Sequence, residues 1–156
     1  MIIRKRHFKK YMNEYKIKKF HISDYKSLIS LYQKSGLAFK PQGRDSYIQL
    51  KNQIKDNNCI IYLAVAGKEI IGSVLATHDT RKGWINRLAV VPEYRRKGIA
   101  SSLVIKAEQW LENKGIEIVA CLIEGWNKDS MKFFQKRNYK QYPDVAYYTK
   151  RKYPEV

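Results

Sequence analysis

The chain has 156 residues, enough for one domain with a hydrophobic core of its own. Its 31 lysines and arginines outnumber its 14 aspartates and glutamates, so the formal net charge at pH 7 is +17. That charge favours an anionic partner but does not identify it. A contribution to general solubility explains the charge equally well. No apolar run approaches the ~18 residues of a membrane-spanning helix, which argues against an integral membrane protein.

The basic N-terminus and the two cysteines indicate the limits of the domain and the cellular compartment. Residues 1–10 carry several cations and no acid. They lack the apolar stretch of a secretory signal, so we expect a basic arm over residues 1–14 and a single domain over residues 15–156. Cys59 and Cys121 lie in apolar, strand-like runs without the spacing of a metal or redox motif. This usage favours reduced thiols and a cytoplasmic protein.

The first predicted elements are a strand and a helix. Residues 16–21 alternate apolar and charged side chains, which is typical of a strand. Ser23 or Asp24 is suited to cap a helix, and Gly36 to end it. The loop over residues 37–43 contains proline and glycine and continues to the next helix.

A second helix and a hairpin follow. The spacing Ser46-x-x-Gln49 matches a capping box and predicts a helix to about residue 55. Its core face should carry Tyr47, Leu50 and Ile54. The runs 59–66 and 69–77 predict two strands, because Gly67-Lys68 between them is a hairpin turn signal.

The next three elements form a strand–helix–strand unit. Residues 84–91 are apolar and β-prone, and Pro92 ends that strand because it lacks a backbone donor. Apolar residues at helical spacing predict a helix over residues 99–114, and Gly115 is suited to end it. Residues 117–123 predict a fifth strand. A right-handed crossover places this strand parallel to the strand at 84–91.

The chain should close with a helix over residues 127–137 and strands over 139–142 and 146–150. The element order is therefore β-α-α-β-β-β-α-β-α-β-β. It predicts a mixed α/β fold with a mostly antiparallel sheet, helices on both faces and one parallel junction. A ligand could enter where the two parallel strands separate.

The segment between the fourth strand and its helix has the features of an anion cradle. Arg95, Arg96 and Lys97 supply positive charge, and Gly98 allows a tight turn and a close backbone approach. The first turn of the following helix presents free N–H groups and the positive end of the helix dipole. A phosphate or pyrophosphate is the expected ligand.

Arg95-x-x-Gly98-x-Ala100 resembles the pyrophosphate-binding motif of the GNAT N-acetyltransferase family. A second stretch, from Asn127 through Ser130 and Phe133 to Tyr139, resembles the motif that follows the fifth strand in that family. The resemblance implies the GNAT fold and acetyl-coenzyme A as cosubstrate. It implies donor-binding roles for Leu88, Ala89, Val90, Arg95, Arg96, Lys97, Gly98, Ile99, Ala100, Ser101, Asn127 and Phe134, with the Leu88–Val90 backbone pairing to the pantetheine arm.

Phe134 stands where the family often has a tyrosine that protonates the departing thiolate. A thiol with a pKa near 8.5 leaves fairly well without full protonation, whereas an amine with a pKa near 10.4 must first lose a proton. Glu124, at the end of the predicted fifth strand, is our first choice as the base. Asp79 and His78 are weaker choices.

Other side chains have candidate roles in the transfer. Tyr139 or Tyr147 could replace the missing acid, and Cys121 could be acylated in a two-step route, although its strand setting favours a packed thiol. In the family, the loop before the second helix borders the acceptor. That comparison implies an acceptor wall containing Phe39, Arg44 and Tyr62.

The sequence as a whole indicates an enzyme that moves acetyl from acetyl-coenzyme A directly to a primary amine. Two alternatives remain open. Phe134 is compatible with an acyl-coenzyme A binding protein without catalysis, and the +17 charge is compatible with a nucleic-acid or ribosome-associated module. The acceptor and the oligomeric state are open as well.

Overall fold

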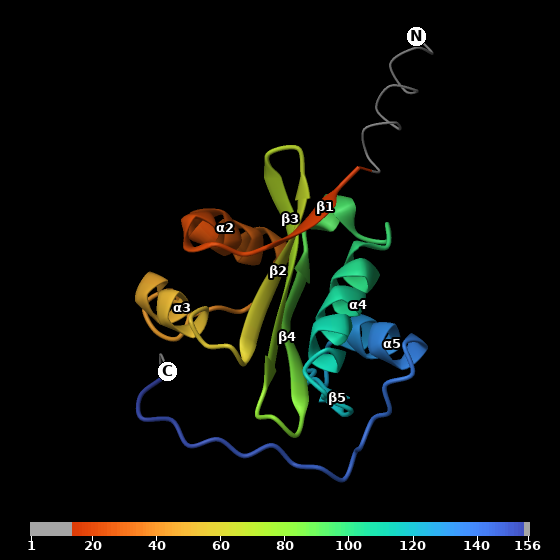
Figure 1. Cartoon of the computed structure of the whole chain (residues 1–156). Coiled ribbons are helices and arrows are strands. Elements are labelled where there is room, and N and C mark those ends of the chain that lie inside the picture. Colours follow the sequence, from red (N-terminus) through yellow and green to blue (C-terminus); the bar gives the residue numbers. More distant parts are fainter. Residues whose placement is uncertain (1–13, 155–156) are drawn as a thin grey trace, which may run out of the picture.

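A five-stranded sheet forms the centre of the computed structural model, which describes residues 14–154 (Figure 1). Its strands follow chain order: β1 (Lys16–Lys19), β2 (Cys59–Ala66), β3 (Glu69–His78), β4 (Gly83–Val90) and β5 (Val119–Ala120). The first four are antiparallel, and β5 is parallel to β4. The predicted parallel junction is confirmed.

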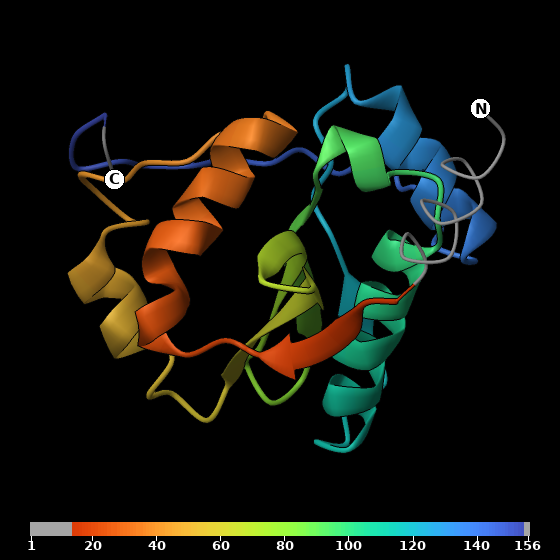
Figure 2. The same cartoon turned by 90° about the horizontal axis from the view of Figure 1, so that it is seen from above.

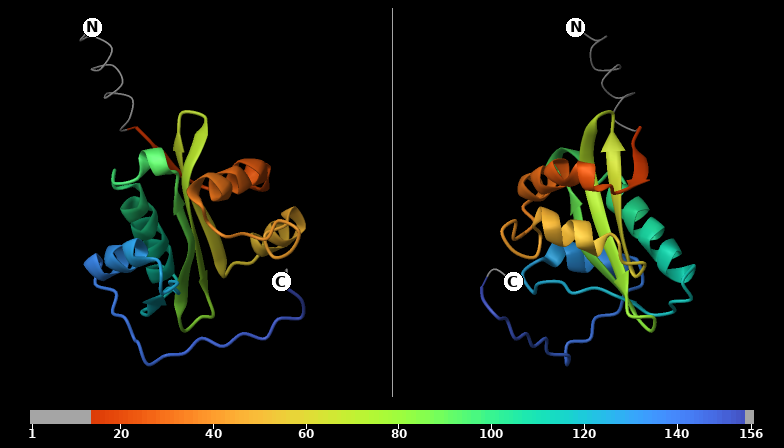
Figure 3. Two further views of the ribbon diagram at one scale, coloured as in Figure 1. Left: turned by 180° about the vertical axis from the view of Figure 1, so that it is seen from behind. Right: turned by 60° about the vertical axis from the view of Figure 1, so that its left-hand side comes forward.

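Helices cover both faces of this sheet (Figures 2 and 3). One face carries α2 (Tyr25–Ser35) and α3 (Tyr47–Gln53), and the other carries α4 (Ile99–Glu112) and α5 (Lys128–Lys136). Short 3₁₀ helices at Ile22–Asp24 and Pro92–Tyr94 precede α2 and follow β4. None of the helices within residues 14–154 is long and apolar enough to cross a membrane.

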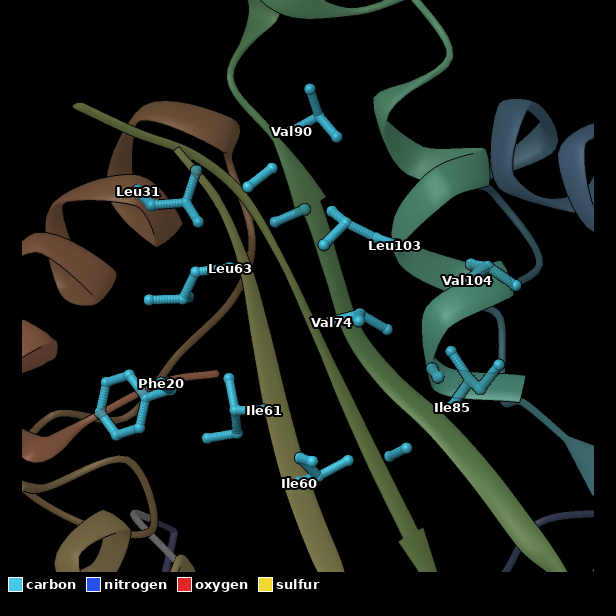
Figure 4. Close-up of a cluster of buried hydrophobic side chains, with 14 of the residues drawn as sticks. Phe20, Leu31, Ile60, Ile61, Leu63, Val74, Ile85, Val90, Leu103 and Val104 are labelled. Atoms are coloured by element: carbon cyan, nitrogen blue, oxygen red, sulfur yellow. The ribbon is translucent and has the colours of Figure 1, made fainter. Parts of the chain in front are cut away.

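The core has two layers, one on each side of the sheet (Figure 4). Ile61 and Leu63 of β2 point to the α2 side of the sheet, where Leu63 lies next to Leu31, whereas Val74 of β3 points toward Leu103 of α4. All five side chains are buried. Since burying one such side chain contributes about 1.5–3 kcal/mol, these two layers hold the helices against the sheet.

Local sequence signals place several boundaries correctly. Gly36 ends α2 with a φ of 73°, a left-handed conformation that glycine adopts without strain. Ser46 Oγ accepts a hydrogen bond from the Gln49 backbone N–H at 3.4 Å, as the capping box predicts. The Gly67-Lys68 hairpin between β2 and β3 is also confirmed.

One cap prediction holds only in part, and one core prediction is wrong. Asp24 occupies the N-cap position of α2, but its carboxylate binds the His21 N–H and the Lys18 ammonium instead of the N–H groups of that helix. Tyr47 is exposed, because its ring packs edge-on against Tyr25 at the surface, with ring centroids 5.4 Å apart. Leu50 is buried as predicted.

The C-terminal third differs most from the sequence prediction. β5 contains only Val119–Ala120 instead of residues 117–123. Within residues 14–154, no strand follows α5, so the closing strands over 139–142 and 146–150 are wrong for this part of the chain. A strand needs a neighbour for its backbone groups, and neither segment has one in the single chain. Almost all of the proposed basic arm, residues 1–13, lies outside the described residues.

Gly83 provides a test of how tightly β4 packs under α4. A Cβ at this position would lie 2.8 and 2.9 Å from the two Leu111 δ-carbons, and Leu111 is fully buried. We expect Gly83→Ala to lower the free energy of unfolding by about 1–3 kcal/mol through overpacking, measured by urea denaturation. At Gly125 a Cβ would meet nothing within 4 Å, so Gly125→Ala is the matched control. Equal stability of the two variants would contradict this packing.

Candidate active site

The parallel pairing between β4 and β5 covers only two residue pairs. Only Gly83 pairs with Val119 and Trp84 with Ala120, whereas β4 continues to Val90. Within the described chain, the β4 edge from residue 85 to 90 therefore has no strand beside it on the β5 side. Unpaired backbone groups on such an edge can bind an extended ligand as an additional strand.

The segment after β4 leads into a helix start with unused N–H groups. Arg96 and Gly98 have left-handed φ values of 61° and 81°, which turn the backbone sharply. The first hydrogen bond of α4 runs from the Ser102 N–H to the Gly98 carbonyl at 3.0 Å. The N–H groups of residues 98–101 precede that bond and have no acceptor within the helix. Together with the positive end of the helix dipole, these free N–H groups have the features expected of an anion cradle.

The three basic residues of this segment have different positions. Arg95 donates to the Val90 carbonyl at 3.0 Å and to the Ser35 carbonyl at 2.9 Å. Lys97 donates to the Glu93 carbonyl at 2.8 Å. These two side chains fix the shape of the loop. Arg96 is exposed, and no hydrogen bond or ion pair joins its side chain to another described residue. Arg96 is therefore the cation best placed to meet a bound phosphate.

A β-bulge redirects the middle of β4. Leu75 pairs with Asn86 and Ser73 with Ala89, so two residues of β4 stand opposite one residue of β3. Arg87 lies in the bulge with a φ of 53°, which is unusual for a residue with a Cβ. The Ser73 hydroxyl donates to the Arg87 carbonyl at 3.1 Å and holds this conformation.

The bulge sends the Arg87 side chain to the α2 and α3 face. Simple alternation from Gly83, whose Cβ would point at α4, would place residue 87 on the α4 face. Instead, Arg87 Nη2 lies 2.7 and 2.8 Å from the two carboxylate oxygens of Asp45. The guanidinium also lies over the Tyr32 ring, 5.7 Å from its centroid.

Asp45 connects this arginine to the loop before α3. Its carboxylate accepts the Lys40 N–H at 2.7 Å, and its carbonyl accepts the Tyr25 hydroxyl at 2.9 Å. The side chains of Asp45 and Arg87 are only 8% and 17% exposed. The sequence analysis missed this pair because its members are 42 residues apart and no local pattern joins them.

Two of the three predicted acceptor residues lie near this ion pair. Phe39 packs against Tyr32, with ring centroids 6.2 Å apart. Arg44 is exposed, with Nε 3.9 Å from Asp45 Oδ2. Tyr62 does not join them, because its ring faces α4, with Lys106 Nζ 6.0 Å from its centroid.

The candidate bases lie at opposite ends of β4. Glu124 follows β5 on the side where the strands separate; its side chain is exposed, and its carbonyl accepts the Asn127 N–H at 2.8 Å. Asp79 lies in the β3–β4 turn, where hydrogen bonds from the Lys82 and Arg81 N–H groups hold the pKa of its carboxyl below the ordinary value. His78 ends β3 beside that turn, and its Nδ1 accepts the Thr80 N–H. Position therefore favours Glu124.

The remaining candidates lie in packed surroundings, except Tyr147, which is 72% exposed. Phe134 is buried, with its ring centroid 4.9 Å from that of Tyr139. The Tyr139 hydroxyl donates to Glu108 at 2.8 Å; burial and this carboxylate raise its pKa. Burial raises the pKa of the Cys121 thiol to about 11, so little thiolate exists at neutral pH. Asn127 Oδ1 accepts the Ser130 N–H at 3.1 Å and caps α5.

Comparison with known proteins gives consistent results. The model of the "Acetyltransferase (GNAT) family" matches residues 9–139. The acetyltransferase SG1711 of Sodalis glossinidius is 24% identical over 135 residues, covering 86% of this chain and 94% of that protein. The N-alpha-acetyltransferase 30 of Schizosaccharomyces pombe is 28% identical over 92 residues, covering 56% of this chain and 61% of that protein.

Solved structures share the fold. AAC(6')-Iy in complex with a bisubstrate analogue, CoA-S-monomethyl-acetylneamine, has a TM-score of 0.75 at 18% identity and covers 88% of this chain and 99% of its own. The PaiA N-acetyltransferase of Thermoplasma acidophilum in complex with coenzyme A has a TM-score of 0.72 at 23% identity and covers 80% of this chain and 88% of its own.

The Asp45–Arg87 pair should stabilise the fold far more than a surface pair. Breaking a buried pair leaves a charge without compensation, which typically costs 3–5 kcal/mol. Since Arg87 keeps some exposure, we expect Asp45→Asn to lower the free energy of unfolding by about 3 kcal/mol in urea denaturation. Glu69→Gln removes the exposed Lys34–Glu69 pair and is the control, with an expected loss of about 0–1 kcal/mol. The assignment fails if both variants lose the same amount.

Proposed function

The chain belongs to the GNAT acetyltransferase family, and we propose that it moves acetyl from acetyl-coenzyme A directly to a primary amine. The observation that carries this proposal is the open edge of β4 beside the free N-terminus of α4. We further propose a single domain over residues 15–156 after a basic arm over residues 1–14, and a cytoplasmic location, which rests on the two free cysteines.

The start of α4 suits the pyrophosphate of the donor. A Cβ at Gly98 would meet no atom within 4 Å, so packing does not require a glycine at this position. The glycine is required by the left-handed backbone, and it leaves the space at the helix start open to a ligand. The N–H groups of Gly98, Ile99, Ala100 and Ser101 would hold phosphate oxygens. The exposed Arg96 would add positive charge next to the bound pyrophosphate. Arg95 and Lys97 hold the conformation of the loop through their hydrogen bonds to backbone carbonyls.

The edge of β4 suits the pantetheine arm. Amide groups of the arm would pair with backbone groups of Leu88, Ala89 and Val90, as a short extra strand. The bulge at Arg87 lies just before this segment, so the ion pair with Asp45 holds the edge in register with the acceptor loop. Acetyl-coenzyme A supplies the acetyl group as a thioester at the end of that arm.

The acceptor amine needs a base more than the donor needs an acid. A lysine-type amine is mostly protonated at neutral pH, since its pKa is near 10.4. We propose that Glu124 takes this proton, directly or through water, because it follows β5 where the strands separate. Phe134 offers no hydroxyl to the thiolate, and Tyr139 donates its own hydroxyl to Glu108, so we propose that neither of these two residues protonates the thiolate.

The acceptor itself is proposed only as a primary amine. The related proteins include aminoglycoside N-acetyltransferases and an N-alpha-acetyltransferase, so both amino sugars and peptide N-termini belong in the first screen. Phe39 and Arg44 are the proposed acceptor contacts on the loop before α3; Tyr62 is a weaker one, since it faces α4.

A second candidate function is acyl-coenzyme A binding without catalysis, favoured by the buried, hydroxyl-free Phe134. Thiol release in the presence of an amine panel distinguishes the two, since a binding protein releases none. The +17 charge supports a separate proposal of an anionic macromolecular partner, which salt-dependent binding to RNA or DNA tests.

Acetyl-coenzyme A should raise the melting temperature because it binds only the folded cradle. At 100-fold excess over Kd the stabilisation is about 2.7 kcal/mol, or roughly 5–10 °C for a domain of this size. Gly98→Val should abolish the shift. Gly115→Val is the matched control, since Gly115 has a similar φ of 75° and lies at the far end of α4. Its own stability should fall, but its ligand-induced shift should remain. Absence of a shift in the wild-type protein at millimolar ligand would refute the donor assignment.

Glu124→Gln keeps the shape of the side chain and removes its basicity. Turnover at neutral pH should fall by roughly 10²-fold or more, the usual contribution of a positioned base, with the ligand-induced melting shift unchanged. The deficit should shrink at high pH, where the free amine is abundant. Glu117→Gln, an exposed glutamate before β5, is the control and should keep wild-type turnover. If Glu124→Gln also turns over normally, Glu124 has no part in the proton transfer.

A further inference from the structure

The charge of the loop before α3 indicates which kind of amine the transfer uses, an inference that rests on the function proposed above. A donor with its pyrophosphate at the start of α4 and its pantetheine arm along Leu88–Val90 places the thioester near the bulge at Arg87. The Arg87 guanidinium donates to the Ala38 carbonyl and to the Asp45 carboxylate, so the loop over residues 37–45 lies directly beside that bulge. An acceptor that reaches the thioester from the α2 and α3 face therefore passes this loop.

Basic residues outnumber acids along this face. Residues 20–56, which form α2, α3 and the loops around them, contain the cations Lys26, Lys34, Lys40, Arg44, Lys51 and Lys55 and the acids Asp24, Asp45 and Asp56. All three carboxylates already accept hydrogen bonds, from the Lys18 ammonium, the Arg87 guanidinium and the Asn58 N–H respectively. An acceptor with several ammonium groups would therefore meet net positive charge here, and like charges repel one another.

Arg44 is the cation of this loop that can bind an anionic ligand. Its Nε lies 3.9 Å from Asp45 Oδ2, too far for a hydrogen bond. That oxygen already accepts Arg87 Nη2 at 2.8 Å and the Lys40 N–H at 2.7 Å. The Arg44 side chain is 43% exposed and donates no hydrogen bond to another residue within 14–154. A guanidinium presents parallel N–H donors in one plane, which match the oxygens of a carboxylate or a phosphate.

Glu124 carries the complementary charge across the free edge of β4. It follows β5, its side chain is exposed, and in the described part of the chain its carboxylate has no hydrogen-bond or ion-pair partner. An acceptor with an amino group at one end and an anion at the other would therefore be oriented at both ends, by Glu124 and by Arg44. Orientation of this kind brings the amine to the thioester in a productive geometry.

We propose that the acceptor is an anionic amine, whose carboxylate or phosphate binds Arg44 while its amino group faces Glu124. The transfer breaks the thioester C–S bond and forms an amide C–N bond; the amine proton goes to Glu124, and the electron pair leaves with the thiolate. The net charge of +17 favours the same class, since it attracts anionic acceptors and repels polycations. A phosphorylated amino sugar or a peptide with an acidic residue near its N-terminus fits this site, whereas an aminoglycoside with several ammonium groups does not.

Acceptors that differ only in charge test this proposal. The dipeptide amides Gly-Glu, Gly-Gln and Gly-Arg share one amino terminus, and glucosamine 6-phosphate and glucosamine form a second series. With acetyl-coenzyme A and thiol release as the readout, kcat/KM of the wild-type protein should be roughly tenfold higher for the acidic member of a series, the usual contribution of one charge-assisted hydrogen bond. The peptides carry a carboxylate and the sugar a phosphate, so the two series also identify the anion.

Arg44→Glu reverses the charge of the loop, and Arg44→Lys keeps the charge but loses the planar donors. In Arg44→Glu, KM should rise by roughly tenfold or more for the acidic acceptors and fall for the Gly-Arg amide. Turnover and KM for acetyl-coenzyme A should stay unchanged, because Arg44 contacts a part of the acceptor that does not react. Arg44→Lys should keep part of the preference. Lys68→Glu makes the same charge change at an exposed position in the β2–β3 turn and should leave the preference intact; circular dichroism checks folding throughout.

Equal kcat/KM for all members of a series, or a wild-type preference for the neutral or cationic member, would overturn the proposal. So would a preference that survives Arg44→Glu or that Lys68→Glu reduces equally, since net charge and not Arg44 would then select the acceptor. No turnover with any amine would refute the transfer itself. The anion site is then judged by melting with coenzyme A bound, where the Gly-Glu amide or glucosamine 6-phosphate at millimolar concentration should raise the melting temperature of the wild-type protein but not of Arg44→Glu. Absence of that rise would overturn the site as well.

Discussion

The parallel pairing of β4 with β5 lasts for only two residue pairs, and the rest of the site depends on where it ends. Gly83 makes the pairing possible, since a larger residue would collide with Leu111 of α4. Beyond Trp84 the two strands lie apart, so β4 keeps one free edge over the length that leads to the anion cradle. The packing of Gly83 against Leu111, at the end of β4 that pairs with β5, therefore determines where the free edge of β4 begins.

The bulge in β4 links the proposed donor edge of the sheet to the proposed acceptor loop. Arg87 belongs to the strand whose edge would hold the pantetheine arm, yet its side chain binds Asp45 in the loop before α3. The left-handed backbone at Arg87 costs conformational energy, which the hydrogen bond from Ser73 and the buried ion pair offset. One residue thus fixes the position of the β4 edge relative to the loop before α3.

Local patterns in the sequence predicted the first four strands, the four described α-helices, the parallel junction and the turn before α4, because turns, caps and periodicity determine these over a few residues. They did not predict the Asp45–Arg87 pair, which joins residues far apart in the chain, or the bulge that redirects Arg87. Nor did they distinguish Arg95 and Lys97, which hold the loop, from Arg96, which faces outward. The strand prediction after α5 failed in the single chain because a strand requires a partner, which a local pattern cannot supply.

The central claim is that the donor binds along the free edge of β4 and at the start of α4. Amide hydrogen exchange with and without acetyl-coenzyme A tests it most directly. The account predicts slower exchange in peptides that cover residues 85–90 and 96–102, with no change in α3. No protection of either segment at saturating ligand, or protection confined to α2 and α3, would contradict it.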